Sequence, residues 1–260
     1  MSPARSDHER MNMLRMLKYL ALCGVASRRN AEKMILDGRV SVNGETVTAM
    51  GVQVDETADE VCLDGQPVRP EAEKHYLAYN KPVGEVTTVS DPEGRATVMD
   101  RFRDYPVRLF PVGRLDYDSE GILLLSNDGE MMNRVLHPSY EIKKAYLVRV
   151  SNQVTDAEIF QLRKGVMIDG RLTSPAEVRL IRRETFSTDL LITIHEGRNR
   201  QVRKMIEAVG HQVVRLKRVQ FGPVMLGDLP SGMWRKLTEE EIRKLLSSDG
   251  KGRGKPISSN

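Results

Sequence analysis

The chain has 260 residues, 40% of them hydrophobic and 29% charged, and its formal net charge is +4. This composition excludes a wholly disordered chain and fits a small domain followed by a medium one. Two cysteines, Cys23 and Cys62, are too few and too far apart for a disulfide framework or a zinc site. The histidines show no metal-ligand spacing and no nucleotide-binding glycine pattern occurs, so we expect no metal and no cofactor.

The predicted elements begin with two helices behind a polar tail at residues 1–11. Apolar residues recur at helical spacing over residues 13–23, and Gly24 supplies a stop, which predicts a first helix. A second helix is predicted between an N-cap at Ser27 and a stop at Gly38. Its basic residues lie opposite its apolar side, so its outward face is expected to carry positive charge.

Strands are predicted after the two helices. Alternating valines lead into Asn43-Gly44, which is a strong hairpin signal. Further strands are predicted over residues 46–54 and 60–63. Residues 12–70 are therefore expected to form a compact helix-helix-sheet module.

A linker at residues 71–74 separates this module from a second domain over residues 75–245, and residues 246–260 form another polar tail. The predicted strands of this domain cover residues 76–79, 109–112, 122–125, 144–150 and 190–194, and the predicted helices cover residues 130–136, 156–164, 201–208 and 239–246. Hairpin-length links and scattered helices indicate an α+β fold with a largely antiparallel mixed sheet.

Basic residues are concentrated in two stretches of the chain. Residues 15–39 hold six Lys or Arg against two acids, and residues 195–220 hold seven Lys or Arg against two acids. Two separated basic patches indicate an extended polyanion as partner, and nucleic acid is the commonest one. Such runs are also typical of solvated helical faces, so charge by itself does not decide between the two.

The segment GRLDYDSEGILLLSNDG, residues 113–129, places Asp116 and Asp118 on a loop before an apolar run. Loops braced by strands often carry reactive groups. Aspartate is also common in such loops as a turn or capping residue. The residue pattern leaves both interpretations open.

The front segment LRMLKYLALCGVASRRNAEKMILDGRVSVNG resembles, over nearly its whole length, the RNA-binding module first named from ribosomal protein S-four. The resemblance implies that the second helix contacts the RNA backbone through Arg28, Arg29 and Lys33. Backbone contacts position an RNA without reading its sequence.

Residues 113–129 resemble the signature of the ribosomal RNA pseudouridine synthases, in which the Asp after Gly-Arg-Leu is the essential carboxylate. Asp116 occupies that position. Further blocks of the family follow the expected order: NKPVG at 80–84, KAYLV at 144–148, EGRNRQVRKM at 196–205, and RLKR at 215–218 with FGP at 221–223. Ser119, Ser126 and Glu85 depart from the usual pattern, but none of them is a presumed catalytic position.

The resemblance implies that a uridine in RNA is isomerised to pseudouridine without redox or energy input. Asp116 would act either as nucleophile at the sugar or as base on its 2′ proton, and Tyr146 would stack on the flipped base. Arg203 is our choice for the cation that pairs with Asp116, with Arg200 as the alternative. The remaining basic residues expected to hold RNA phosphates are Arg114, Lys144, Arg198, Arg200, Lys204, Arg215 and Arg218.

The sequence of residues 113–130, together with MNRVLHPSYEIKKAYLV after it, resembles the large-subunit branch of these synthases, subfamily B. We therefore expect 23S ribosomal RNA as the partner. The small-subunit branch is the alternative target, and a non-catalytic RNA-binding or ribosome-assembly protein is the alternative function. Retention of Asp116, Tyr146 and a candidate arginine favours the enzyme. The apolar stretch over residues 17–26 is too short to span a bilayer, so we expect a cytoplasmic protein, and we also expect a monomer.

Overall fold

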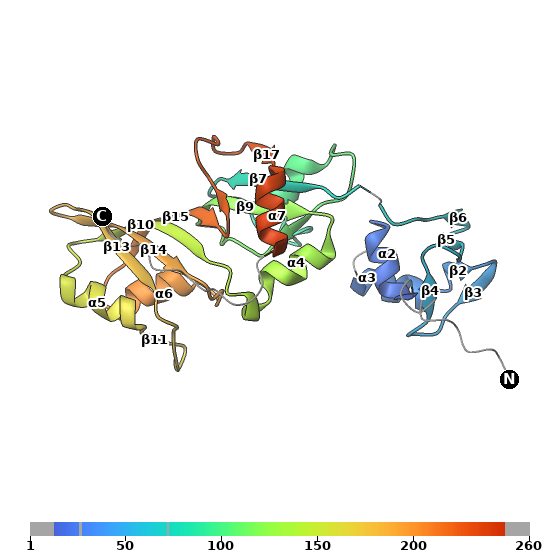
Figure 1. Ribbon diagram of the computed structural model, residues 1–260, viewed down its shortest axis with the longest axis horizontal. Coiled ribbons are helices and arrows are strands. Elements are labelled where there is room, and N and C mark those ends of the chain that lie inside the picture. Colours follow the sequence, from blue (N-terminus) through green and yellow to red (C-terminus); the bar gives the residue numbers. More distant parts are fainter. Residues whose placement is uncertain (1–12, 26–27, 72, 248–260) are drawn as a thin grey trace. The chain divides into compact units, whose positions relative to one another are not determined.

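The computed structural model describes residues 13–25, 28–71 and 73–247 (Figure 1). The described residues form two compact units, one within residues 13–74 together with 105–108 and one of residues 75–104 with 109–247. The predicted tail at 1–11, the N-cap at Ser27 and most of the tail at 246–260 lie outside the described residues. No helix in the described part of the chain is long and apolar enough to cross a membrane.

The first unit is built from short elements around its own core. They are β1 Met13–Arg15, α2 Met16–Leu22, α3 Arg28–Leu36, β2 Val40–Val42, β3 Glu45–Val47, β4 Gln53–Asp55, β5 Val61–Leu63 and β6 Gln66–Pro67. Strands β3, β2, β5 and β6 form one sheet in that order, and β1 pairs with β4. Buried side chains of both helices, among them Tyr19, Leu20 and Ile35, pack on Val40 and Val61 of this sheet. The apolar sides of the two helices therefore cover the strands, as the helix-helix-sheet prediction required.

Two boundaries in this unit differ from the predictions. Residues 13–15 are not helical, because they pair as a strand with Gln53–Asp55, and the helix begins at Met16. The strand predicted over residues 46–54 is interrupted between β3 and β4, where Gly51 has a φ of +88°. The hairpin at Asn43-Gly44 is confirmed, and both residues have the positive φ that its tight turn requires.

The second unit contains a long mixed sheet. Its elements are β7 Tyr76–Lys81, η1 Val98–Phe102, β8 Phe110–Val112, β9 Glu120–Ser126, α4 Gly129–Leu136, η2 Pro138–Tyr140, β10 Lys144–Ser151, α5 Asp156–Lys164, β11 Met167–Ile168, β12 Arg171–Leu172, β13 Glu177–Arg183, β14 Ser187–Ile194, α6 Gln201–Ala208, β15 Val213–Phe221, β16 Val224–Met225, β17 Trp234–Lys236 and α7 Glu239–Ser247. The strand order is β13-β14-β10-β15-β9-β7-β17, with β16 beside β15 and β8 beside β9. Neighbouring strands of this sheet are antiparallel except β9 and β15, which confirms the predicted α+β fold with a largely antiparallel mixed sheet.

The helices of this unit begin at strong local signals. Asp128 caps α4 by accepting hydrogen bonds from the N–H groups of Glu130 and Met131, and Thr155 with Glu158 forms a capping box on α5. Figure 1 shows α4 and α7 beside the β7–β9 half of the sheet, and α5 and α6 beside the β10–β14 half. All four helices lie where the sequence predicts them.

Strands β13 and β15 were not predicted, although both belong to the main sheet. In each of them Arg or Lys residues alternate with apolar ones, and in β15 these residues are predicted as a basic patch and a family block rather than as a strand. Polar and apolar residues alternate in this way along a strand that has one exposed face and one buried face. The basic residues of β15 therefore divide between an exposed face, with Arg215, and a buried face, with Arg218.

Strand β9 lies in the centre of the sheet, and all seven of its residues are buried. Its parallel partner β15 approaches it very closely at Gly121, where a Cβ atom would lie 2.2 Å from the carbonyl oxygen of Arg218. The φ of Gly121 is +106°, a conformation that other residues rarely adopt. Gly121 therefore allows β15 to lie directly against the start of β9, next to the loop that carries Asp116.

Candidate active site

The loop between β8 and β9 carries Asp116, and a buried lysine fixes its backbone. The Lys81 ammonium group, fully buried, donates to the carbonyl oxygens of Pro82 at 2.9 Å, Asp116 at 3.1 Å and Ser119 at 2.8 Å. These bonds use all three donors of the ammonium group. Burial lowers the pKa of Lys81 to about 8, because water is absent to stabilise its charge.

Two further contacts hold the same loop from the segment after β7. The Thr87 hydroxyl donates to the carbonyl of Leu115 at 2.7 Å and accepts from its N–H at 3.2 Å. The N–H of Gly84 donates to the carbonyl of Tyr117 at 2.9 Å. The backbone on both sides of Asp116 is thus held in one conformation, which leaves its side chain as the group presented to the surroundings.

The carboxylates of this loop face two arginines of the α6 region. The Arg200 guanidinium donates twice to Asp118, at 3.2 and 3.0 Å, and its Nη1 lies 3.8 Å from Oδ2 of Asp116. The Arg203 Nη2 lies 3.2 Å from Asp118 Oδ2 and donates to the Asp118 carbonyl at 2.9 Å. Burial acts to raise the pKa of Asp118, but the hydrogen bond from Arg200 and the charge of Arg203 outweigh it and hold this pKa below its ordinary value.

Arg200 has an unusual backbone conformation. It is the residue before α6, and its φ of 50° and ψ of 34° lie in the left-handed region. A residue with a Cβ atom pays about 1–3 kcal/mol there, and such positions are concentrated at functional sites. The conformation is compatible with the double hydrogen bond to Asp118, which connects α6 to the Asp116 loop.

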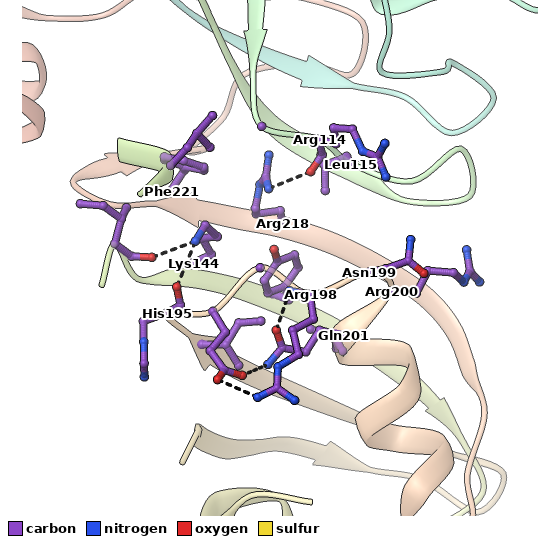
Figure 2. A pocket seen from close by; sticks show the side chains of 18 of the residues that line it. Arg114, Leu115, Lys144, His195, Arg198, Asn199, Arg200, Gln201, Arg218 and Phe221 are labelled. Atoms are coloured by element: carbon purple, nitrogen blue, oxygen red, sulfur yellow. Dashed lines mark hydrogen bonds and ion pairs between the residues drawn. The ribbon is translucent and has the colours of Figure 1, made fainter. Parts of the chain in front are cut away.

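A cavity of about 690 Å³ opens beside the two carboxylates. The side chains of Asp116, Tyr146, Lys144, Arg218 and Phe221 are among those that line it, and residues 197–201 close another side. Figure 2 shows Lys144, Arg218 and Phe221 grouped together, apart from the loop that carries Arg198 to Gln201. Tyr146 is 8% exposed, so its ring is part of the wall rather than of the outer surface. The volume lies within the range of ordinary ligand pockets, about 300–1,000 Å³.

A polar network supports the loop before α6. The Glu196 carboxylate accepts from Ser174 Oγ at 2.7 Å, Gln201 Nε2 at 2.7 Å and Arg198 Nη2 at 3.1 Å. Arg198 also donates to the carbonyl of Leu172 at 2.8 Å, which joins the β11–β12 hairpin to this loop. Arg198, expected to hold an RNA phosphate, thus already makes structural contacts.

The structure brings some of the expected site residues together and leaves others apart. The cavity is lined by Arg114, Asp116, Lys144, Tyr146, Arg198, Arg200 and Arg218. Arg203, Lys204 and Arg215 do not line it and instead contact Asp118, Asp169 and Glu120, respectively. In the first unit, Lys33 is exposed on α3, whereas the side chains of Arg28 and Arg29 lie outside the described structure.

The expected pairing of Arg203 with Asp116 is not the one observed. Arg203 pairs with Asp118, and Arg200, the alternative, is the arginine beside Asp116. Arg200 contacts both aspartates, whereas Arg203 donates to the carbonyl of Asp118 and to Ser119 Oγ. The contacts of Arg203 thus fall on the residues that follow Asp116 in the loop.

Two residues important for this geometry were given no role by sequence reasoning. The sequence places Lys81 in a family block, and for Asp118 it leaves open whether the residue is reactive or part of a turn. A lysine at the end of the apolar strand β7 was the available signal, since a buried lysine requires partners. Two of its three acceptors, however, come from residues more than thirty positions further along the chain.

Comparison with known proteins agrees with this arrangement. Residues 75–208 match the family model of RNA pseudouridylate synthases, and residues 14–61 match that of the S4 domain. An RNA pseudouridine synthase of Aquifex aeolicus is 44% identical over 92% of this chain and 96% of its own length. Ribosomal large subunit pseudouridine synthase B of Bacillus subtilis is 42% identical over 92% of this chain and 99% of its own. A crystal structure of a pseudouridylate synthase shares 33% identity and a TM-score of 0.66, covering 89% of this chain and 99% of that one.

Together these matches define an RNA-modifying enzyme with an RNA-binding domain in front. The chain belongs to the RNA pseudouridylate synthase family. The expectation of an enzyme rather than a non-catalytic binder is thereby confirmed, as is the resemblance of the front module to the S4 domain.

Proposed function

We propose that this protein converts a uridine of 23S ribosomal RNA into pseudouridine, with Asp116 as the reacting carboxylate. The observation that carries the proposal is the position of Asp116, whose side chain is 28% exposed, in the wall of a cavity that Tyr146 also lines. A carboxylate on a fixed backbone, facing a pocket of nucleotide size, is suited to act on a sugar that enters the pocket.

The reaction moves one bond within a single nucleotide. The bond from ribose C1′ to uracil N1 breaks, the base turns, and C5 of the base bonds to C1′ while C5 loses a proton and N1 gains one. Asp116 can contribute by attacking C1′ or by taking the 2′ proton. Arg200 Nη1 lies 3.8 Å from Oδ2 of Asp116 and places a positive charge beside this carboxylate.

Tyr146 and the surrounding basic residues have separate tasks in this proposal. A uridine must leave its stack at a cost of a few kcal/mol, and the ring of Tyr146 receives the base. Arg114 and Arg200, exposed beside the cavity, suit phosphates flanking the target. Lys33, with Arg28 and Arg29 on the same helix, suits contacts with the RNA backbone.

The choice of ribosomal RNA, and of its large subunit, rests on the relatives. Several proteins that are 42–43% identical to this chain are named ribosomal large subunit pseudouridine synthase B. They support the same class of target here and leave the particular uridine to be determined.

Mapping of pseudouridine in ribosomal RNA tests the proposal. RNA from cells with and without the gene is treated with carbodiimide and read by primer extension. We expect one large-subunit stop to disappear without the gene, to return with the wild type and not to return with Asp116→Asn, because the amide can neither attack C1′ nor accept a proton. Asp228→Asn, at an exposed aspartate away from the cavity, is the matched control and should restore the stop. No lost stop, or a stop restored by Asp116→Asn, contradicts the proposal.

A further inference from the structure

Two cations of the cavity wall, Lys144 and Arg218, make no ion pair with a carboxylate in the described structure. Lys144 Nζ donates to the carbonyls of Ile142 at 3.1 Å and His195 at 3.2 Å. Arg218, only 2% exposed, donates from Nε to the carbonyl of Ile122 at 2.7 Å and from Nη1 to that of Arg114 at 3.4 Å. Carbonyl oxygens orient these two cations without forming an ion pair with them.

Arg218 also has a donor without an acceptor. Its Nη2 is buried and has no hydrogen-bond partner among the described residues. A buried guanidinium N–H without a partner is costly, at roughly 1–3 kcal/mol or more for a charged group. Such a group in the wall of a cavity points to a ligand atom that accepts from it.

The strand register places both cations beside the tyrosine that receives the base. Strands β10 and β15 pair Tyr146 with Arg218 and Lys144 with Phe221, and opposite residues of a pair project from the same face of a sheet. Lys144 Nζ lies 5.7 Å and the Arg218 guanidinium 5.2 Å from the centre of the Phe221 ring, so both cations border one aromatic surface (Figure 2). The charge of Arg218 adds to burial in lowering the pKa of Lys144 to about 8.

We propose that Arg218 and Lys144 bind the uracil ring itself and stabilise the negative charge that it carries once its bond to the sugar is broken. This inference rests on the proposed function and deepens it. When the C1′–N1 bond breaks, its electron pair leaves with the base as a uracilate anion, with charge on N1 and the two carbonyl oxygens. Attack by Asp116 on C1′ and removal of the 2′ proton both release this same anion. The assignment therefore holds for either route.

The interaction strengthens only as the reaction proceeds. Uracil is neutral in the substrate, so the two cations meet a dipole before bond cleavage and a full charge after it. An interaction that is stronger in the transition state than in the ground state accelerates the chemical step. In a site shielded from water, a fixed donor for a developing oxyanion is worth about 10²–10³ in rate.

This role differs from the phosphate contact expected for both residues. A phosphate carries its charge throughout, so losing its partner weakens RNA binding and reduces the salt dependence of that binding. A partner of the uracilate affects the rate constant of the bound complex instead. The two roles therefore predict different measurements.

The test compares Arg218→Gln and Lys144→Gln with Arg179→Gln, a matched change at an exposed arginine of β13. Each full-length variant reacts in excess with target RNA carrying either uridine or 5-fluorouridine, and loss of the N-linked nucleoside is followed by digestion and mass spectrometry. We expect Arg218→Gln to lower the rate on uridine by about 10²-fold and Lys144→Gln by about 10-fold, with dissociation constants within about threefold of wild type. Fluorine stabilises the anion, so the ratio of fluorouridine to uridine rates should rise at least about tenfold in both variants. Arg179→Gln should behave as wild type.

The ratio of the fluorouridine rate to the uridine rate does not depend on how much of a variant is folded, because both rates come from the same preparation. An unchanged ratio in both pocket variants would show a purely structural role and overturn the proposal. A raised dissociation constant with a shallower salt slope would assign the residues to a phosphate and overturn it as well. Failure of the wild type to form any pseudouridine would instead refute the proposed function.

Discussion

The inner and outer sides of the site hold their positive charges in different ways. The inner cations, Lys81, Lys144 and Arg218, donate to backbone carbonyls and have no ion pair with a carboxylate in the described structure. The outer cations each lie within ion-pair distance of an acid: Arg198 with Glu196, Arg200 with Asp118, Lys204 with Asp169 and Arg215 with Glu120. The inner cations are therefore oriented without a paired acid, whereas these four outer cations already have one.

The difference in partners gives the two sets of cations different roles. The inner cations hold parts of the site in place, whereas the outer cations can exchange a carboxylate for an RNA phosphate. A partly exposed ion pair contributes only about 0–1 kcal/mol, so an RNA phosphate can replace the carboxylate of an outer cation at small cost. A buried cation bonded to carbonyls cannot be removed so easily, because the acceptors lose charge-assisted bonds of about 1.5–3 kcal/mol. Substitutions on the inner side should thus affect folding and chemistry, and those on the outer side should affect RNA binding.

Of the substitutions that test the difference between inner and outer cations, Lys81→Met should have the largest effect. It keeps the length of the side chain but removes three hydrogen bonds, so the Asp116 loop loses its support. We expect activity to fall by at least about 10²-fold, because a carboxylate displaced by 1 Å reacts poorly. We expect the second unit to lose about 3 kcal/mol of stability. Single-turnover assays and calorimetry measure both, with the exposed Lys236→Met as control. Wild-type activity in Lys81→Met would show that the loop needs no inner cation.

Substitutions of Tyr146 test whether the aromatic ring in the cavity wall binds the target base by stacking. Stacking of a base on a ring is worth about 1–3 kcal/mol, so Tyr146→Ala should reduce kcat/KM by about 10- to 100-fold. Tyr146→Phe keeps the ring and should lose much less. Steady-state kinetics on the target RNA decide the matter. An equal loss in both variants would assign the role to the hydroxyl group.

Arg203 and Arg200 offer a direct contrast, because both contact Asp118 from the same helix region. Both lie within ion-pair distance of the Asp118 carboxylate, but Arg203 is 8% exposed and also donates to two carbonyls, at 2.9 and 3.4 Å, whereas Arg200 is exposed. We expect Arg203→Gln to lower stability by about 2 kcal/mol and Arg200→Gln by less than about 1 kcal/mol, as measured by thermal unfolding. Activity should fall about tenfold in both. Similar stability losses in the two variants would remove the distinction between inner and outer cations for this pair.

Much of the fold follows from local signals, whereas the site depends on tertiary contacts. The helices over residues 130–136 and 156–164 and the turn at Asn43-Gly44 could be predicted, because periodicity and turn residues act within a few positions, and the structure adds caps at Asp128 and Thr155. Strand β15 was missed since its alternating basic residues resemble a solvated face. The partners of Lys81 and the choice of Asp118 over Asp116 by Arg203 depend on packing between distant segments, which residue spacing does not reveal.

The S4 unit supplies the smallest expected effect, because the proposed role of its basic helix is to bind RNA and not to take part in the reaction. Replacing Arg28, Arg29 and Lys33 together with Gln should weaken binding several-fold and leave the single-turnover rate of the saturated complex unchanged. If the three residues contact phosphates, the slope of log K against log salt should become shallower by about 2, since RNA binding releases fewer counterions when these phosphate contacts are lost. Binding titrations at several salt concentrations measure this, with Arg179, Lys236 and Arg243 changed to Gln as an equal loss of exposed charge elsewhere. A slope equal to that of the control would mean that α3 contributes only net charge, and that the outer cations beside the cavity make the phosphate contacts.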